Sequence, residues 1–458
     1  MATDCIPQVA FSFHGTRQRV IASFDTEHAT TDGGLPLLKA VDEKLGLIER
    51  LAGALHDRRD PIRTQHSYRA LLSQRIYGLA CGYEDANDAA RLAHDPMHKL
   101  VVDRDPIVGR ALAAQPTLSR FENAVDSKDL YRMAEALADT VIASERHHRR
   151  RRRPKLITID LDPTDDAAYG QQELVFFNGH YKNWCYLPVV ATIAFDEESD
   201  QKLVTAMLRP GNVGASHGAI GLLRRLVVKL RHAFPRTRLR VRLDGGFTDP
   251  DLFTFLENHR LDYLVGMPGN SKLKGISAEL MSEAEALSEK SGETERAWGE
   301  VDYRTRRWER HRRVVIKAEM TRLAGRDPRR NARFVVTNLR MKPERVYAIY
   351  RRRGDQENRI KELKHDLALG RTSCTRFLAN QLRVLMTAAA YVLMQQLRRH
   401  AAGTSCAHAQ VSTLRLRLLK VAAWLQRSVR RIQVHLPVSF AWRDDWLCIA
   451  RRLGAIPP

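Results

Sequence analysis

The order of strands and helices between residues 156 and 267 limits most strictly what this chain can fold into. Three runs rich in apolar and β-branched residues predict strands, at 156–162, 187–195 and 203–208. Their connections are short, so an antiparallel meander is expected. Helices are predicted next at 217–233 and 249–258, and strands at 239–243 and 263–267. Strands joined through a helix need a crossover, which predicts parallel neighbours.

This order of elements is that of an RNase H-like domain. The fold class expected is therefore α/β, with an RNase H-like mixed-sheet core over residues 149–400. We place its start at the run Arg149–Arg153, where a helical pattern gives way to a strand pattern. Within it, residues 272–342 predict a polar helix and a β-rich insertion, with strands at 298–303, 314–320 and 333–339.

Both flanking regions are predicted to be helical. In residues 1–148, helices are expected at 35–47, 68–80 and 85–92, and a further one starts at Thr117, which would be its N-cap. A small helical region on a basic protein often binds DNA, and the same pattern equally describes an ordinary helical bundle. Helices at 344–367 and 376–398 complete the core domain, and residues 401–458 form a helical C-terminal region with a helix at 414–425.

Two aspartates lie on the first strand, and another ends a later strand. Asp160 and Asp162 are two residues apart, so their side chains share one face, opposite the apolar side chains of the strand. We expect the apolar face to meet the core and the carboxylates to face outward. Asp244 lies at the end of strand 239–243, before two glycines that allow close approach of backbone or substrate. Ligands of open parallel sheets collect at the carboxyl ends of strands, so Asp162 and Asp244 should lie side by side.

The helix at 344–367 carries one face that is unsuited to a protein core. Tyr350, Arg353, Glu357 and Lys364 follow one another at intervals of three, four and seven residues, and Lys361 joins the same face. Such a face suits a carboxylate directed at a metal, with cations beside it that bind phosphates.

Asp162, Asp244 and Glu357 together offer the hard oxygen ligands that Mg²⁺ prefers, and Mn²⁺ can substitute for it. Two such ions, about 3.5–4 Å apart, can activate an attacking oxygen and stabilise a leaving one in phosphoryl transfer. The chain also carries a formal net charge of +22, an excess that binding to nucleic acid favours. These residues therefore favour metal-dependent cutting and joining of DNA strands.

Several other classes of protein are disfavoured. Six cysteines occur, but none lies in a Cys-x-x-Cys pair or near a His-x-x-x-His pair, so neither a zinc site nor a disulfide framework is expected. No signal peptide is recognised, and the most apolar stretch, 384–394, is too short to span a membrane. A cytoplasmic protein, associated with the nucleoid and without a membrane partner, is expected.

The helix face matches a known signature at every position. Tyr350, Arg353, Glu357 and Lys364 form the pattern Tyr-x2-Arg-x3-Glu-x6-Lys, which is typical of a superfamily of DDE transposases. The chain resembles in particular the thirteen-eighty family of bacterial insertion-sequence transposases (transposase DDE domain, group 1).

Other segments of the chain carry the same resemblance. Residues 159–164 resemble the block around the first aspartate, 242–247 that around the second, and 24–28 and 116–123 two N-terminal blocks. The resemblance covers nearly the whole chain, more weakly after about residue 400. Asp160 and Asp162 are both available as the first aspartate, with Asp165 and Asp166 close by; the Asp-x-Thr context favours Asp162.

The resemblance implies an RNase H-like catalytic core and cut-and-paste movement of DNA bounded by terminal inverted repeats, with strand transfer into target DNA. Tyr350, Arg353 and Lys364 would hold phosphates of the DNA end. Some relatives stack a flipped base on an aromatic residue of the insertion, for which Trp298 and Trp308 are candidates beside their ordinary role in strand packing. Two DNA ends must be brought together, which implies a homodimer in the synaptic complex.

Two alternatives share part of this evidence. An RNase H-like, structure-specific endonuclease would use the same chemistry without strand transfer. A catalytically inactive DNA-binding regulator would keep the basic charge but not need the three carboxylates. Inverted repeats and a short target duplication in the flanking DNA would favour the transposase.

Overall fold

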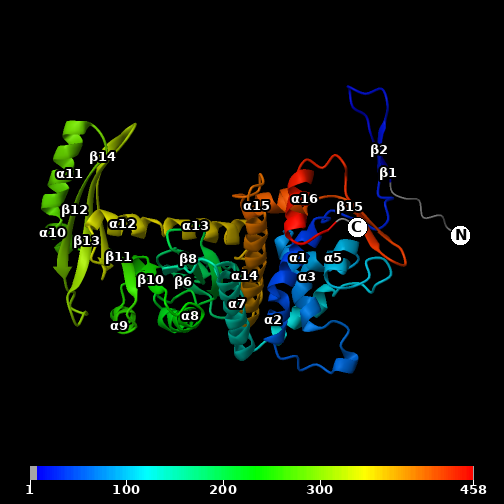
Figure 1. Ribbon diagram of the computed structural model, residues 1–458, viewed down its shortest axis with the longest axis horizontal. Helices are drawn as coiled ribbons and strands as arrows, with labels where there is room; N and C mark the ends of the chain where they lie inside the picture. The colour runs from blue at the N-terminus through cyan, green and yellow to red at the C-terminus, as the bar shows by residue number, and fades with distance from the viewer. Residues whose placement is uncertain (1–7, 457–458) are drawn as a thin grey trace.

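An eight-stranded mixed sheet extends from the middle of the protein to the end opposite the N-terminal helices in a computed structural model that describes residues 8–456 (Figure 1). Its strands lie in the order β12-β13-β14-β11-β10-β4-β8-β9. Their bounds are β4 Leu156–Pro163, β8 Val189–Phe195, β9 Lys202–Met207, β10 Arg238–Leu243, β11 Asp262–Met267, β12 Glu295–Tyr303, β13 Arg312–Leu323 and β14 Arg326–Thr337. The chain is thus an α/β protein, as the sequence predicts.

The strand pairing predicted for residues 156–267 is confirmed. β4, β8 and β9 pair antiparallel in that order, and β4, β10 and β11 pair parallel. Helix α8 (Ala219–Ala233) leads from β9 to β10, and α9 (Pro250–Asn258) joins β10 to β11. The sequence did not predict the small sheet between β4 and β8, which consists of β5 Asp166–Ala167, β6 Phe176–Asn178 and β7 Asn183–Tyr186.

Residues 272–342 continue the central sheet at its far edge. β14 pairs antiparallel with β11, β13 with β14, and β12 with β13. Helices α10 (Ser271–Ile276) and α11 (Ala278–Ser291) accompany these strands. β14 therefore satisfies the backbone N–H and C=O groups that the edge of β11 would otherwise expose.

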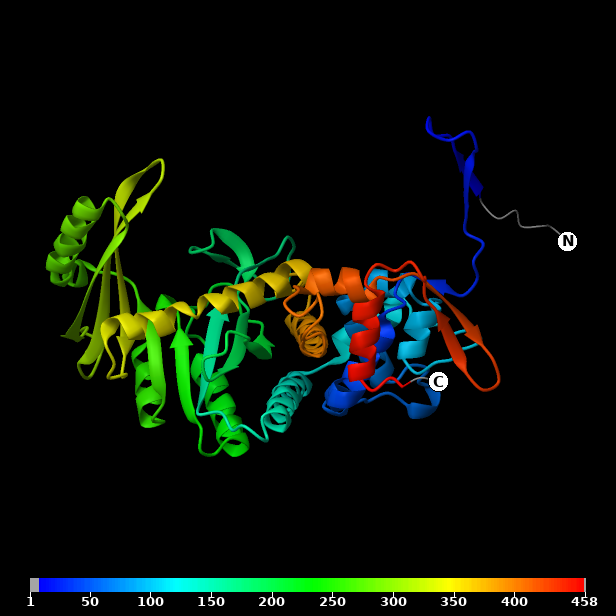
Figure 2. The same cartoon turned by 45° about the horizontal axis from the view of Figure 1, so that its top comes forward.

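A long rod of helix crosses one face of the sheet (Figure 2). It consists of α12 (Pro343–Arg351), α13 (Gly354–Lys361) and a π-helical turn, Glu362–Asp366. The sequence predicts a single helix over 344–367, but the α-helix is interrupted just before Gly354, where glycine is about 1 kcal/mol less favourable in a helix than alanine. The residues of the expected face therefore lie on consecutive helical pieces.

The N-terminal helices pack beside the sheet around helix α14 (Phe377–His400). Their bounds are α1 Leu35–Leu45, α2 Leu47–Gly53, α3 Tyr68–Ala80, α4 Ala86–Arg91, α5 Pro96–Val101, α6 Gln115–Ala124 and α7 Ser127–His148. The prediction that Thr117 caps its helix is wrong, because α6 begins at Gln115 and has proline in its first turn. Proline has a backbone angle already set for a helix start.

The C-terminal region is only partly helical, which corrects the prediction. Helix α15 (Val411–Leu414) and a π-helical turn to Leu419 give way to strand β15 (Ala423–Arg427), so a helix over 414–425 is wrong in its second half. β15 pairs with β16 (Ile432–His435) and with β3 (Ala29–Thr30), and α16 (Arg443–Arg452) follows. Its partner β3 lies at the other end of the chain, which no local pattern can show.

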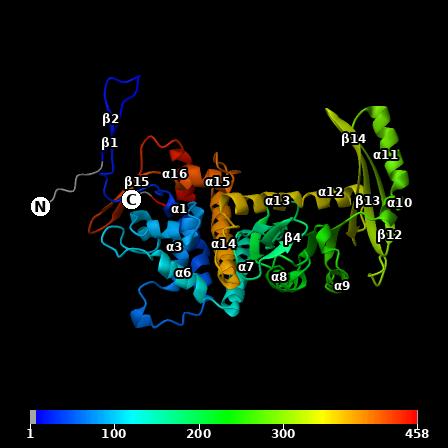
Figure 3. The same ribbon diagram turned by 180° about the vertical axis from the view of Figure 1, so that it is seen from behind.

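Strands β1 (Gln8–Phe11) and β2 (Val20–Ser23) form a hairpin that extends away from the body (Figure 3).

Helix α14 is the one helix within residues 8–456 that is long and apolar enough to cross a membrane. It packs against α3, α7 and β9, and 83% of its most apolar window is buried inside the protein. This burial is typical of a core helix. The apolar stretch at 384–394 is thus the centre of a helix that joins the N-terminal helices to the central sheet.

Candidate active site

Asp162 and Asp244 lie side by side where two neighbouring parallel strands end. The register of β4 and β10 sets Leu161 beside Leu243, and an aspartate comes next on each segment. The carboxylate of Asp244 accepts a hydrogen bond from the backbone N–H of Gly246 at 2.9 Å. The fold therefore brings two of the three candidate carboxylates to one edge of the sheet.

Glu357 reaches the same edge from α13, with Arg353 between it and Asp162. Nη1 of Arg353 lies 2.8 Å from Oδ2 of Asp162, and Nη2 lies 3.5 Å from Oε1 of Glu357. The side chain of Glu357 is 56% exposed, whereas that of Asp162 is 11% exposed. The carboxylates thus share a guanidinium that balances part of their charge.

Asp160 is buried, which corrects the expectation that both carboxylates of the first strand face outward. It accepts hydrogen bonds from Nε and Nη2 of Arg242, at 2.7 and 2.8 Å, and its side chain is 0% exposed. Arg242 also donates to the backbone C=O of Ile349 in α12 at 2.9 Å. The helical rod covers this face, so Asp160 ties strand to helix, while Asp162 lies near the end of the strand and keeps a small exposed fraction.

The buried side chain of Gln356 fixes the position of α13 over the sheet. Its amide nitrogen donates to the backbone C=O of Asp160 at 3.2 Å and to that of Val190 at 3.0 Å. One amide therefore attaches the helix to β4 and β8 together. Glu357 is the next residue along, so its position at the edge depends on this contact.

Burial and like charges raise the pKa of Asp162 to about 7. Removal from water is the largest cause, and the negative charges of Asp244 and Glu357 add to it, while Arg353 opposes it. The cluster thus carries excess negative charge that a bound cation would relieve. Carboxylate oxygens from two strand ends and a helix are donors suited to Mg²⁺ or Mn²⁺, so these residues fit a divalent metal.

Tyr350 packs closely against the sheet beside this cluster. A Cβ atom at Gly266 would lie 2.3 Å from Oη of Tyr350, so any larger residue there would have to displace this hydroxyl. A groove of about 640 Å³ runs from this point toward the outer strands β13 and β14. Aromatic rings and cations line it, among them Phe334, Tyr347, Tyr350, Arg296, Lys317, Arg333, Arg351 and Arg353.

A cluster of three carboxylates beside a cationic groove is an arrangement suited to a phosphodiester, and the comparison of sequences agrees with it. The family model described as transposase DDE domain group 1 matches residues 13–457. The chain belongs to this family. Membership supports a transposase function and an enzyme that acts on DNA, and DDE transposases typically use divalent metals. No match to a curated protein was found.

The two lysines of the helix face differ in their surroundings. Nζ of Lys364 lies 2.8 Å from the carboxylate of Asp165 and 2.9 Å from its backbone C=O. Lys361 is exposed and forms no ion pair with any residue from 8 to 456. Lys361 is therefore free to meet a phosphate, whereas Lys364 would first have to leave Asp165.

The two candidate tryptophans also differ. Trp298 is half-buried on β12, with its ring 5.5 Å from that of Tyr347, which lines the groove. Trp308 is 3% exposed and packs against Phe253 and Tyr303. Trp308 is thus a core residue. Trp298 contacts the ring of Tyr347, which lies between it and the groove.

Two residues beside the carboxylate cluster were not predicted from the sequence. Tyr181, between β6 and β7, has its pKa raised to about 12, mainly by burial and then by carboxylates that include Asp162 and Asp244. Arg209 is buried, and burial lowers its pKa to about 10, while the charge of Asp244 raises it. Neither belongs to a recognisable motif, because only the fold places them beside the aspartates.

A second group of possible metal ligands lies among the N-terminal helices, although the sequence predicts no zinc site. Ligand atoms of Asp32, Cys81 and His98 lie within 4.8 Å of one another. Asp32 already has three side-chain partners, Nζ of Lys420 at 2.7 Å, Nε2 of His98 at 2.9 Å and the hydroxyl of Tyr83 at 2.9 Å. The carboxylate is therefore neutralised by a lysine of the same chain, and the group acts as a buried polar link between its N-terminal and C-terminal regions.

Proposed function

We propose that the protein is the transposase of a bacterial insertion sequence, which cleaves DNA at the ends of its element and joins those ends to target DNA. The observation that carries the proposal is the meeting of Asp162, Asp244 and Glu357 around Arg353. The net charge of +22 supports a DNA substrate. The order of the strands supports an RNase H-like core, and the signature on the helical rod supports the thirteen-eighty family.

Mg²⁺ or Mn²⁺, as a pair of ions held by the three carboxylates, would activate the attacking oxygen and stabilise the leaving one in phosphoryl transfer. The residues of the chain position the DNA. Arg353 balances the carboxylates until a phosphate arrives, and its guanidinium can then turn to a phosphate oxygen, for which its fork of donors is well suited. Asp160, Arg242 and Gln356 keep strand and helix in place during this exchange.

The groove beside the cluster is the path that we propose for the DNA end. Tyr350 and Arg353 line it, and Lys361 and Lys364 continue the same face of the rod. An unpaired base in this groove would meet the ring of Tyr347 first, and Trp298 supports that ring from behind. The apolar and aromatic walls offer the stacking that an extruded base needs.

The larger organisation follows from the same proposal. Residues 1–148 would bind DNA, 149–400 would form the catalytic domain with the insertion 272–342, and 401–458 would complete the structure. The partners would be duplex DNA with terminal inverted repeats, target DNA and a second copy of the chain in the synaptic complex. A cytoplasmic, nucleoid-associated location suits these partners.

Replacement of Asp244 by asparagine tests the proposal. Wild-type protein with Mg²⁺ should cleave DNA that carries the ends of its element and join them to a second DNA. Asp244→Asn should lose both reactions and still bind DNA, because a neutral amide is a poor Mg²⁺ ligand. The matched control is Asp251→Asn, which changes an exposed aspartate on α9 and should keep full activity.

The products distinguish the remaining possibilities. Full activity of Asp244→Asn would remove Asp244 from the mechanism. Cleavage by the wild type without joining would indicate a structure-specific endonuclease, and tight binding without any cleavage would indicate a regulator.

A further inference from the structure

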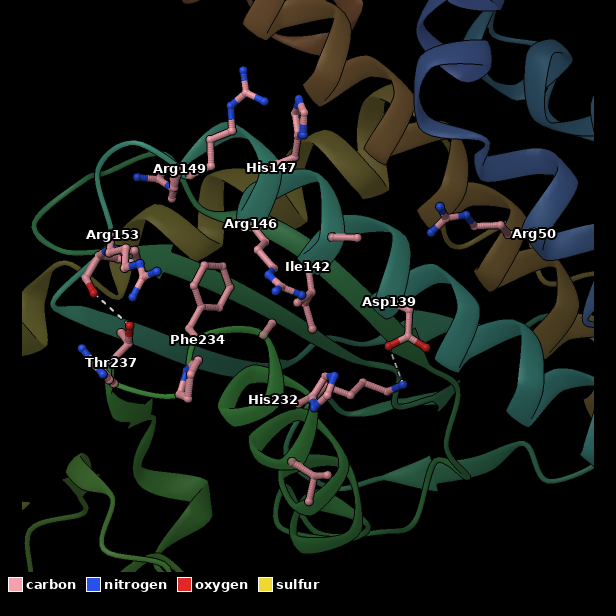
Figure 4. A pocket seen from close by; sticks show the side chains of 18 residues that line it. Arg50, Asp139, Ile142, Arg146, His147, Arg149, Arg153, His232, Phe234 and Thr237 are labelled. Atoms are coloured by element: carbon pink, nitrogen blue, oxygen red, sulfur yellow. Dashed lines mark hydrogen bonds and ion pairs between the residues drawn. The ribbon is translucent and has the colours of Figure 1, made fainter.

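A second basic site lies at the opposite end of the central strands from the carboxylates. A cavity of about 890 Å³ opens between the end of α7, residues 149–154, the end of α8 and the turn at 234–237 (Figure 4). β4 and β10 begin beside it, whereas Asp162 and Asp244 lie where they end. Six residues of a strand rise about 20 Å. The cavity and the carboxylates therefore lie at opposite ends of the same two strands.

The lining of this cavity is strongly cationic. Asp139 is the one carboxylate among its lining residues, and Nζ of Lys229 already lies 2.6 Å from it. Arg149 pairs with Glu145 and Glu198. The other arginines of the lining form no ion pair within residues 8–456: Arg50, Arg146, Arg150, Arg153 and Arg236. Several arginines thus line one space without an anion paired to them.

The helix ends account for only part of this charge. The last turns of α7 and α8 favour cations, because the carbonyl groups there carry partial negative charge, and Arg146 and His232 lie in those turns. Arg150, Arg153 and Arg236 come after the helices, where this effect has fallen off. Their mutual repulsion would be relieved by a polyanion that spans them.

The floor of the cavity is apolar. Ile142 and Phe234 are buried beneath the charged side chains. Figure 4 shows the side chains of Arg146 and Arg153 extending toward the ring of Phe234 from two sides. The backbone of nucleic acid has the complementary form, with apolar sugar edges between charged phosphates.

We propose that this cavity binds the phosphodiester backbone of a second DNA segment, distinct from the segment that is cut at the carboxylates. The proposal rests on the proposed function, since transposition handles element ends and target DNA together. Arginines from separate segments, spread over a cavity of about 890 Å³, suit several successive phosphates better than one free anion. The segment would be held where β4 and β10 begin, while another occupies the groove beside Tyr350.

Two double variants within one arginine run provide a matched test. Arg150→Ala with Arg153→Ala removes two lining guanidinium groups, whereas Arg151→Ala with Arg152→Ala removes the same charge from exposed neighbours outside the lining. Affinity for a long duplex is measured by fluorescence anisotropy over a range of KCl concentrations, without divalent metal. The logarithm of the binding constant falls linearly with the logarithm of the salt concentration, and each lost phosphate contact reduces the magnitude of this slope by about 0.9.

We expect the slope of the cavity variant to be smaller in magnitude by about 1.8. Its binding should be weaker at least about tenfold near 0.1 M KCl. The control variant should keep the wild-type slope. Equal slopes for the two double variants would overturn the proposal. None of the four arginines forms an ion pair within residues 8–456, so we expect both double variants to fold as the wild type does. Thermal unfolding of each variant checks this.

A second measurement locates the DNA. Val228 lines the cavity and is 64% exposed, so a photo-crosslinking amino acid placed there should capture bound duplex. Capture from a position on the exposed hairpin β1–β2 but not from Val228 would place the DNA elsewhere and overturn the proposal. Binding is measured without metal, so a failure of cleavage would contradict the proposed function and leave this result unaffected.

Discussion

Replacing Asp160 and Asp162 by asparagine, one at a time, should separate two carboxylates that lie on the same face of one strand. Asp160→Asn leaves Arg242, which is 5% exposed, without its anionic partner. Removing one partner of a buried ion pair costs about 3–5 kcal/mol. The asparagine oxygen can still accept one hydrogen bond, so we expect a loss of about 3 kcal/mol in the free energy of unfolding.

Asp162→Asn should have the opposite sign when metal is absent. The pKa of Asp162 is raised from 3.8 to about 7 in the folded protein, so its ionised form is less favourable there than in the unfolded chain. Above about pH 7 the wild type carries this penalty in full, and asparagine removes it. This shift already includes the contact with Arg353 and corresponds to about 4 kcal/mol. Relaxation of the site around the charge reduces the penalty, so we expect the variant to be about 1–2 kcal/mol more stable at pH 8.

The pH dependence follows from the same shift. Between about pH 4 and pH 7 the folded state holds a proton that the unfolded state has lost, so the wild type loses stability relative to Asp162→Asn as the pH rises through this window. Below about pH 4 the carboxyl group is protonated in both states, and the difference should vanish. Urea unfolding in EDTA, followed by circular dichroism, measures each free energy.

Cleavage with Mg²⁺ completes the comparison. Asp162→Asn should be folded and inactive, whereas Asp160→Asn should be less stable but retain cleavage at a temperature where it is folded. The reasoning is refuted if Asp160→Asn matches the wild type in stability, or if Asp162→Asn still cuts DNA.

Two further variants test how the helical rod is held. Gly266→Ala should destabilise the protein by about 1–3 kcal/mol, because the new methyl group would lie 2.3 Å from Oη of Tyr350. Adding Tyr350→Phe should recover most of the loss, and a double-mutant cycle that is additive within about 0.5 kcal/mol would contradict the contact. Gln356→Ala should lower the free energy of unfolding by about 2–4 kcal/mol and slow cleavage, because it detaches α13 from β4 and β8 and leaves a cavity. If unfolding by urea and cleavage are both unchanged, the amide does not position Glu357.

Much of the central sheet could be predicted from the sequence, because its strands carry a local signal. β8 is a nearly continuous apolar run, β4 and β10 alternate apolar with polar residues at the strand period, and the intervening helices repeat apolar residues at their own period. The positions of Asp162 and Asp244 at strand ends, and the spacing of the residues from Tyr350 to Lys364, follow from the same local patterns. These features depend on neighbours within a few residues.

Only the tertiary structure decided which of these charged groups meet. Asp160 and Asp162 are equivalent by periodicity, yet Arg242 takes one of them into a buried pair and leaves the other at the edge. The strand β15 depends on β3 at the far end of the chain, and the basic cavity depends on helix ends that come together in space. Local periodicity determines which face of an element is apolar, whereas the partner of a charge is set by contacts between distant segments.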